Sequence, residues 1–81
     1  MNVLIYSKRN CTFCTKAKVL LDTKGIAYKE TIIGEDMLRE DFLEMFPNVT
    51  TVPLIYVDGQ QIGGYNELRE YIEQRPQYLE G

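Results

Sequence analysis

Two cysteines separated by two residues, Cys11 and Cys14, are the side chains of this sequence best suited to covalent chemistry. The chain contains no histidine, which excludes Ser-His and Cys-His nucleophile pairs and the commonest general base near neutral pH. Most zinc-ligand sets are excluded for the same reason. Any reaction must therefore use thiol, carboxylate, amine or phenol groups, and the cysteine pair is the first candidate.

The cysteine pair lies where an apolar segment, residues 2–6, is expected to give way to a helix. The first turn of a helix carries unpaired N–H groups and a partial positive charge of about half a unit, which stabilise a sulfur anion. Cysteines three positions apart lie on one turn, close enough to form a disulfide. We therefore expect Cys11 at the exposed end of the helix and Cys14 one turn inside, where it is less accessible.

Three other interpretations of the cysteine pair remain open at this point. A structural disulfide that closes so short a loop contributes only about 2 kcal/mol, and a reducing cytosol tends to keep it open. Half of a zinc site needs further ligands, which only a second copy of the chain could supply. Two unreactive buried cysteines are disfavoured by the polar and basic residues 7–10 before them. Redox chemistry is the interpretation that we carry forward.

Apolar periodicity predicts a strand, a helix and a second strand within the first 32 residues. The strand at residues 2–6 precedes a helix that Gly25 closes, and residues 26–32 resume a strand pattern. A strand, a helix and a strand in about 30 residues form a βαβ unit with parallel strands. The expected apolar positions are Phe13, Ala17, Leu20 and Leu21 in the helix and Ile26, Tyr28 and Ile32 in the second strand.

The rest of the chain predicts a second helix, a hairpin and a last helix. The second helix stops before Pro47, an antiparallel hairpin joins residues 54–57 to 61–63 through a turn, and Gly64 leads into the last helix. The apolar helix positions are Leu38, Phe42, Met45 and Phe46, then Leu68, Tyr71 and Ile72. The order β-α-β-α-β-β-α predicts an α/β fold, a small mixed sheet with helices on both faces.

Length and composition predict a single domain at residues 1–81, because 81 residues leave room for no more. No apolar run approaches the roughly 20 residues that a membrane span needs. The start of the chain also lacks the pattern of a signal peptide. We therefore expect a cytoplasmic protein without a membrane partner.

Charge is unevenly distributed along the chain. Residues 1–29 hold six basic residues and one acid, a net charge of +5, and residues 30–81 have a net charge of −8. Nucleic-acid-binding domains are usually strongly basic, so a total of −3 argues against a nucleic-acid partner. The positive excess surrounds both cysteines, where it favours a thiolate. A simpler explanation is that Lys16, Lys18 and Lys24 form the solvated face of a helix.

With these elements in place, the chain resembles the glutaredoxin family over nearly its whole length. Four features carry the resemblance: Tyr6-Ser7-Lys8 ending a strand, Cys11-x-x-Cys14 opening a helix, Thr51-Val52-Pro53 before a strand, and Gly63-Gly64 before the last helix. The resemblance implies a thioredoxin-like fold, a four-stranded mixed sheet flanked by three helices. Cys11 then attacks disulfides and Cys14 resolves the mixed disulfide. Pro53 would be the family's cis-proline, although without the resemblance a plain strand entry is the favoured explanation of these residues.

The resemblance also implies a glutathione-binding site. The backbone of Val52 pairs with glutathione like an added strand, Lys8 meets a glutathione carboxylate, and the start of the last helix receives the γ-glutamyl end. Gly63 and Gly64 either permit a tight turn or let the backbone approach the ligand. The implied set is Lys8, Phe13, Thr51, Val52, Pro53, Gly64, Tyr65 and Asn66, with Arg39 as a further candidate that a solvated helix face explains equally well.

The chain departs from the family pattern at two places. Thr12-Phe13 stands where Pro-Tyr is common, so Phe13 lacks a phenolic hydroxyl, and Asn66 replaces a frequent Asp whose charge could pair with the glutathione amine. Some glutaredoxins without that proline hold a [2Fe–2S] cluster between two subunits, ligated by the first cysteine and glutathione. This departure keeps a cluster-binding alternative open.

The function that the resemblance implies is glutathione-dependent thiol–disulfide exchange. The protein is expected to reduce protein disulfides and glutathione mixed disulfides through Cys11 and Cys14, with glutathione as co-substrate and no metal. Ribonucleotide reductase is implied as one protein substrate, and a thioredoxin-reductase-type enzyme as another electron source. We expect a monomer. The two alternatives are a glutathione-ligated [2Fe–2S] dimer and a non-catalytic thioredoxin-like binding module.

Overall fold

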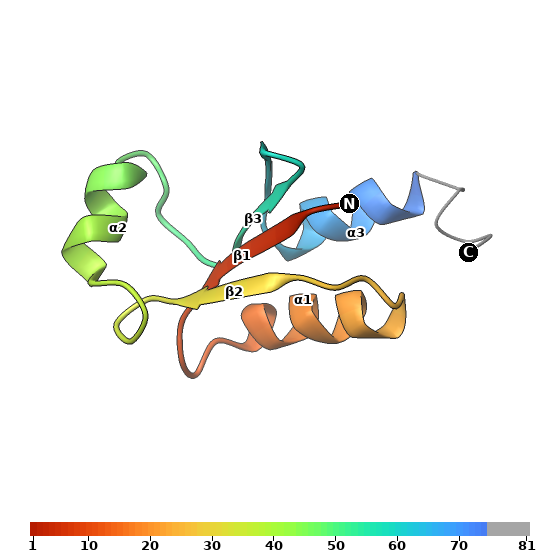
Figure 1. The fold of residues 1–81 in the computed structure, drawn as a ribbon, viewed down its shortest axis with the longest axis horizontal. Helices are drawn as coiled ribbons and strands as arrows, with labels where there is room; N and C mark the ends of the chain where they lie inside the picture. Colours follow the sequence, from red (N-terminus) through yellow and green to blue (C-terminus); the bar gives the residue numbers. More distant parts are fainter. Residues whose placement is uncertain (75–81) are drawn as a thin grey trace.

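The protein, described at residues 1–74 by a computed structural model, contains four strands and three helices (Figure 1). Their order is the predicted β-α-β-α-β-β-α, so the α/β class is confirmed. The strands are β1 (Val3–Ser7), β2 (Lys29–Ile32), β3 (Leu54–Val57) and β4 (Gln60–Gly63). The helices are α1 (Thr12–Thr23), α2 (Arg39–Met45) and α3 (Tyr65–Glu73).

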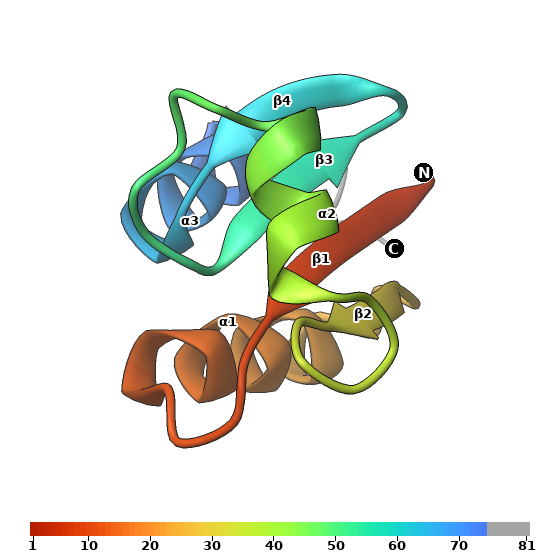
Figure 2. The same ribbon diagram turned by 90° about the vertical axis from the view of Figure 1, so that its left-hand side faces the viewer.

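The strands form a mixed sheet in the order β2-β1-β3-β4. β1 and β2 are parallel, which requires a crossover, and α1 provides it. β3 is antiparallel to both β1 and β4. β1 therefore lies inside the sheet, and its carboxyl end leads into the loop before α1 (Figure 2).

Two hydrophobic clusters cover the two faces of the sheet, because successive strand residues point to opposite sides. α1 and α3 pack on one face, where the buried residues are Val3, Ile5, Ala17, Leu21, Ile55, Val57, Leu68 and Ile72. α2 packs on the other face at one end of the molecule, where the buried residues are Tyr6, Phe42 and Leu54 (Figure 1). Leu4 and Tyr56 on this second face remain partly exposed, so helices cover both faces, as expected, but unequally.

The second strand is shorter than predicted. The strand pattern at residues 26–32 becomes β2 only from Lys29 onward. The reason is the end of α1, where the Ile26 N–H donates to the Leu21 carbonyl oxygen at 2.9 Å and cannot join a strand ladder. Gly25 closes the helix with a φ of 69°, as predicted. Ile26 and Tyr28 still pack against the cluster under α1 and α3.

Three of the predicted apolar helix positions are exposed rather than packed against the sheet. Phe13 stands on the first turn of α1, beyond the core, and is 51 % exposed. Leu38 and Met45 are also exposed, because α2 covers only one end of the sheet. Phe42 and Phe46 do pack there, with ring centroids 5.6 and 5.2 Å from the Tyr6 ring.

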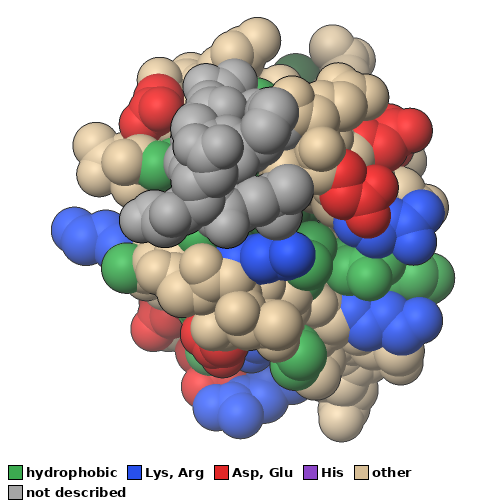
Figure 3. Space-filling model, turned by 90° about the vertical axis from the view of Figure 1, so that its right-hand side faces the viewer, with side chains coloured by type: hydrophobic (Ala, Val, Ile, Leu, Met, Phe, Trp, Pro, Cys, Tyr) green, Lys and Arg blue, Asp and Glu red, His purple; other side chains and the backbone are tan. Residues whose placement is uncertain are grey.

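The end of the molecule away from the cysteine loop has a mixed surface. Figure 3 shows basic, acidic and hydrophobic side chains interspersed on this face. Acidic side chains lie next to basic ones there, so part of the uneven charge along the sequence is balanced in space. Within residues 1–74, no helix is both long enough and apolar enough to cross a membrane.

Candidate active site

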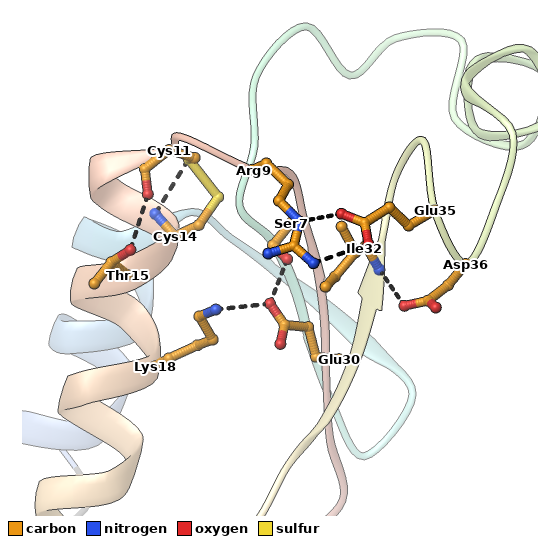
Figure 4. Close-up of polar contacts among 10 residues, drawn as sticks. All are labelled: Ser7, Arg9, Cys11, Cys14, Thr15, Lys18, Glu30, Ile32, Glu35 and Asp36. Atoms are coloured by element: carbon orange, nitrogen blue, oxygen red, sulfur yellow. Dashed lines mark hydrogen bonds and ion pairs between the residues drawn. A yellow bond between two sulfur atoms is a disulfide. The ribbon is translucent and has the colours of Figure 1, made fainter.

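Cys11 is the N-cap residue of α1, at the end of the loop that leaves β1 (Figure 4). The preceding residue, Asn10, has a φ of 56°, a left-handed conformation that asparagine tolerates better than most residues. The Cys14 N–H donates to Cys11 Sγ at 3.2 Å, and the Thr15 N–H donates to the Cys11 carbonyl oxygen at 3.1 Å. The sulfur therefore occupies the predicted place at the helix N-terminus, where an anion is stabilised.

The two sulfurs differ in accessibility. Cys11 and Cys14 form a disulfide, with their Cα atoms 5.2 Å apart. Cys11 is half-buried, whereas Cys14 is only 1 % exposed. Another molecule can therefore reach the sulfur of Cys11 first, and Cys14 can act only on a bond already made to that sulfur.

The segment before β3 lies against the outer sulfur. Cys11 Sγ is 3.8 Å from the Val52 carbonyl oxygen, to which a reduced Cys11 thiol can donate its proton. The Val52–Pro53 peptide bond is cis, as the resemblance implies. Thr51, Val52 and Pro53, which are far from the cysteines in the sequence, are thereby brought beside them.

A groove of about 300 Å³ runs along this segment toward α3. Phe13 and Tyr65 form its apolar part, with ring centroids 6.1 Å apart, and Lys16 Nζ lies 5.1 Å from the centroid of the Phe13 ring. The groove contains every residue implied for glutathione except Lys8. Its lining residues are Phe13, Thr51, Val52, Pro53, Gly64, Tyr65, Asn66 and Glu67.

Glu67 is the groove residue that sequence reasoning missed. Its Oε1 accepts the Gly64 N–H at 2.8 Å, at the N-terminus of α3. Both glycines before α3 lie close to this side chain. Gly63 has a φ of 126°, and a Cβ atom on it would lie 2.9 Å from Glu67 Cγ. A Cβ atom on Gly64 would lie 3.3 Å from Glu67 Oε1. An available signal was a Glu three residues after the N-cap, the spacing of a capping box. The groove thus ends near an acidic group.

Lys8 lies in a second hollow, of about 270 Å³, which shares Thr51 and Val52 with the groove. Arg39 of α2 lines the same hollow. Two cations therefore line a hollow that adjoins the groove. Arg39, which the sequence could not distinguish from a solvated helix residue, lines this hollow together with Lys8.

A third and larger hollow, of about 580 Å³, is lined by residues of β1, α1, β2 and the loop that carries Cys11. The buried Ser7 hydroxyl donates to Glu30 Oε2 at 2.5 Å, and Lys18 Nζ lies 2.9 Å from the same oxygen (Figure 4). Burial raises the pKa of Glu30, but the bonds from Ser7 and Lys18 outweigh it and hold this pKa below its usual range.

Arg9 and Glu35 form a second ion pair on the same side of the loop (Figure 4). The bond to Arg9 lowers the pKa of Glu35, and the bond to Glu35 raises the pKa of Arg9. Both side chains are largely exposed, so this pair contributes little to stability. Two of the basic residues counted around the cysteines are thus matched by acids from later in the chain.

The arrangement as a whole is suited to disulfide exchange. It combines a half-exposed sulfur at a helix N-terminus, a buried partner sulfur within bonding distance and a groove beside them. In the described part of the chain, no group of three or more His, Cys, Asp or Glu side chains is placed to bind a metal ion. These features define a dithiol oxidoreductase of the thioredoxin-like class.

Comparison with known sequences identifies the family within this class. A family model described as glutaredoxin matches residues 3–62. Over 67 residues the chain is 39 % identical to glutaredoxin 3 of Escherichia coli (strain K12), covering 83 % of this chain and 81 % of that protein. The chain belongs to the glutaredoxin family, and it is a thiol–disulfide oxidoreductase.

Solved structures support the same fold. The crystal structure of glutaredoxin 1 from Francisella tularensis, complexed with cacodylate, has a TM-score of 0.79 and 31 % identity, covering 90 % of this chain and 93 % of that chain. A buckwheat glutaredoxin–glutathione complex has a TM-score of 0.73 and 25 % identity, and the match covers 89 % of this chain and 68 % of that chain. The thioredoxin-like fold, with three helices on a four-stranded mixed sheet, is confirmed.

Proposed function

We propose that this protein uses glutathione to reduce protein disulfides and glutathione mixed disulfides through Cys11 and Cys14. The observation that carries the proposal is the place of Cys11 Sγ, which receives the Cys14 N–H and lies 3.8 Å from the Val52 carbonyl oxygen. A sulfur so placed is stabilised as an anion and lies next to backbone that can pair with an extended peptide. Glutathione is such a peptide.

Reduction of a substrate disulfide proceeds in two exchanges. The Cys11 thiolate attacks one substrate sulfur, and the other leaves as a thiolate that takes up a proton. The Cys14 thiol then loses its proton to solvent and attacks Cys11 Sγ. This releases the second substrate sulfur and leaves the Cys11–Cys14 disulfide, so two electrons have passed to the substrate.

Glutathione then supplies two electrons that reduce the Cys11–Cys14 disulfide. One glutathione thiolate attacks Cys11 Sγ, which forms a mixed disulfide and releases Cys14 as a thiolate that takes up a proton. A second glutathione thiolate attacks the sulfur of the bound glutathione, releasing Cys11 as a thiolate and glutathione disulfide as product. Attack at the half-buried Cys11 rather than at the buried Cys14 follows from their exposure.

The surface around the sulfurs supports an orientation for glutathione. Its cysteine residue pairs with the backbone of Val52, and one carboxylate lies near Lys8 and Arg39 in the second hollow. The γ-glutamyl end extends into the groove toward Tyr65 and Asn66 at the start of α3. The buckwheat relative in complex with glutathione supports this assignment by analogy.

The remaining expectations are proposals of the same kind. We propose that residues 1–81 act as one domain in the cytoplasm and that the protein works as a monomer. A ribonucleotide reductase disulfide is a protein substrate that the family suggests, and a thioredoxin-reductase-type enzyme is an alternative electron source.

A reductant comparison tests the proposal. The oxidised protein is supplied either with glutathione, glutathione reductase and NADPH, or with thioredoxin reductase and NADPH, and a glutathione mixed disulfide is the substrate. We expect NADPH consumption that depends on the protein and saturates with substrate in the glutathione system. No turnover with glutathione, in a preparation that dithiothreitol reduces fully, would overturn the glutathione dependence.

The two alternatives have distinct outcomes. Anaerobic reconstitution with iron, sulfide and glutathione would give a brown dimer if the protein carried a [2Fe–2S] cluster, and a colourless monomer would oppose that role. A purely binding module would leave the Cys11 thiol near the pKa of about 8.5 of a free thiol and show no turnover. We expect neither outcome.

A further inference from the structure

The cluster of Ser7, Lys18 and Glu30 is a group of charged and buried side chains that the proposed reaction does not use. Glu30 Oε2 accepts the Ser7 hydroxyl at 2.5 Å and pairs with Lys18 Nζ at 2.9 Å. The Ser7 residue is only 1 % exposed, and the side chains of Lys18 and Glu30 are 31 % and 22 % exposed. The cluster ties α1 to β1 and β2 just below the cysteine loop (Figure 4).

The same hollow is lined by Cys11 and by the three members of the cluster. A carboxylate that faces a hollow shared with a thiolate repels it, and partial burial weakens the screening by solvent. The other charged residues that line the hollow are Lys8 and Arg9, and Arg9 is bound to Glu35. Lys18 is therefore the cation in direct contact with the one carboxylate that lines this hollow.

We propose that Lys18 is a positioning residue that balances the charge of Glu30, so that the carboxylate does not oppose the thiolate of Cys11. The inference rests on the proposed role of Cys11 as nucleophile and assigns to the Lys18–Glu30 pair a function beyond joining two elements. Removing the cation leaves Glu30 without the positive charge that contacts it, and removing the carboxylate leaves Lys18 without the negative charge that contacts it. The two changes must therefore act on the Cys11 thiolate with opposite signs.

The test is a charge cycle in a Cys14→Ser background, in which Cys11 is the remaining cysteine. Lys18→Met, Glu30→Gln and the double variant are compared by titrating thiolate absorbance at 240 nm. We expect Lys18→Met to raise the Cys11 pKa by about half a unit and Glu30→Gln to lower it by a similar amount. The double variant is expected to return close to the parent value. The rate of alkylation by iodoacetamide, measured below the pKa, should change in the matching direction by about twofold, because the roughly threefold change in thiolate fraction is partly offset by the opposite change in thiolate nucleophilicity.

Controls separate charge balance from a structural effect. Lys24→Met removes a positive charge from the far end of α1 and should leave the Cys11 titration unchanged. If breaking the pair acted only by loosening α1, Lys18→Met and Glu30→Gln would shift the Cys11 pKa in the same direction, and that result would overturn the inference. No shift in either variant would also overturn it. Lys18→Gln replaces Lys18→Met if the latter fails to fold.

The parent protein separates this inference from the proposed function. A parent Cys11 pKa near that of a free thiol, together with absent turnover, would remove the proposed function itself. A lowered parent pKa with normal turnover, combined with an unresponsive charge cycle, would leave the function intact and remove only the role of Lys18.

Discussion

The two sides of Cys11 consist of different kinds of chemical groups. On the α3 side, backbone groups and the rings of Phe13 and Tyr65 form an open groove beside the cis-proline segment. On the β2 side, side chains of opposite charge are paired with one another, with Glu30 holding Lys18 and a buried hydroxyl. One side presents an open groove, whereas the other side pairs its charged side chains with one another.

This difference indicates that the two sides have different roles toward the Cys11 sulfur. Extended backbone beside an open groove can pair with an incoming peptide. Groups that are already paired add little binding but set the local charge that the sulfur experiences. Changes on the groove side should therefore alter substrate recognition, and changes on the charged side should alter the ionisation of Cys11 and the stability of the fold.

The largest expected effect on turnover comes from replacing Cys11, whose sulfur lies between the two sides. Cys11→Ser should lower turnover with every disulfide substrate by at least about 10³-fold, because a hydroxyl is not ionised near neutral pH. Serine is itself a favoured N-cap residue, so α1 should still form. Coupled NADPH assays measure the loss, and circular dichroism checks the fold. Substantial turnover by a folded Cys11→Ser protein would exclude Cys11 as the nucleophile.

A selective loss is expected from the inner sulfur. Cys14→Ser should preserve turnover of glutathione mixed disulfides, because that route needs only Cys11. It should slow reduction of protein disulfides by at least about tenfold, since an attached thiol attacks far more often than one in solution. Both substrates are assayed with the same preparation. Equal losses on the two would show that Cys14 does not act as the resolving thiol.

A smaller effect tests recognition on the groove side. Tyr65→Ala removes a ring that packs 6.1 Å from Phe13, and we expect the KM for a glutathione mixed disulfide to rise by about threefold to tenfold. Steady-state kinetics with glutathionylated peptide measure it, and kcat should change less than KM. Val19→Ala, which removes an exposed apolar side chain of α1 outside this groove, is the matched control. An unchanged KM in Tyr65→Ala would remove the groove from the recognition site.

The smallest expected effect is the pH dependence of stability on the charged side. The pKa of Glu30 is lowered in the folded protein, so its stabilising contribution is present above the unfolded pKa of about 4.5 and is lost as the pH falls through the folded value. Relative to Glu30→Gln, the protein should therefore be more stable at pH 7, with the difference shrinking toward pH 3. Urea unfolding across this range measures it. A difference that grows in acid would reverse the assigned sign.

Sequence patterns predicted the helices and strands well where the signals are local. The order of elements, Gly25 at the end of α1 and Cys11 at its start were all predicted, because each depends on residues within one or two turns. The boundary of β2 was missed, because the end of α1 uses a donor that the strand pattern ignores. The exposure of Leu38 and Met45 was missed, because periodicity shows one face of a helix and not how far the neighbouring sheet extends.

In the candidate site, too, sequence reasoning predicted some features and missed those that depend on the fold. The resemblance named seven of the eight residues that line the groove, but it omitted Glu67. Counting charges along the chain overestimated the positive field around the cysteines, because the partners of Arg9 and Lys18 come from the later, acidic part of the chain. The sequence offered Arg39 only as a further candidate, and the fold placed it in the same hollow as Lys8.

What the sequence determined by itself is a pair of thiols at the start of a helix, with the chemistry that this position favours. Tertiary structure decided what surrounds the outer sulfur, through contacts that span 41 residues to Val52, 23 residues between Ser7 and Glu30, and 26 residues between Arg9 and Glu35. The physical reason is range. Helix capping acts between near neighbours in the chain, whereas charge balance and a binding groove depend on distances in space that only the packed sheet fixes.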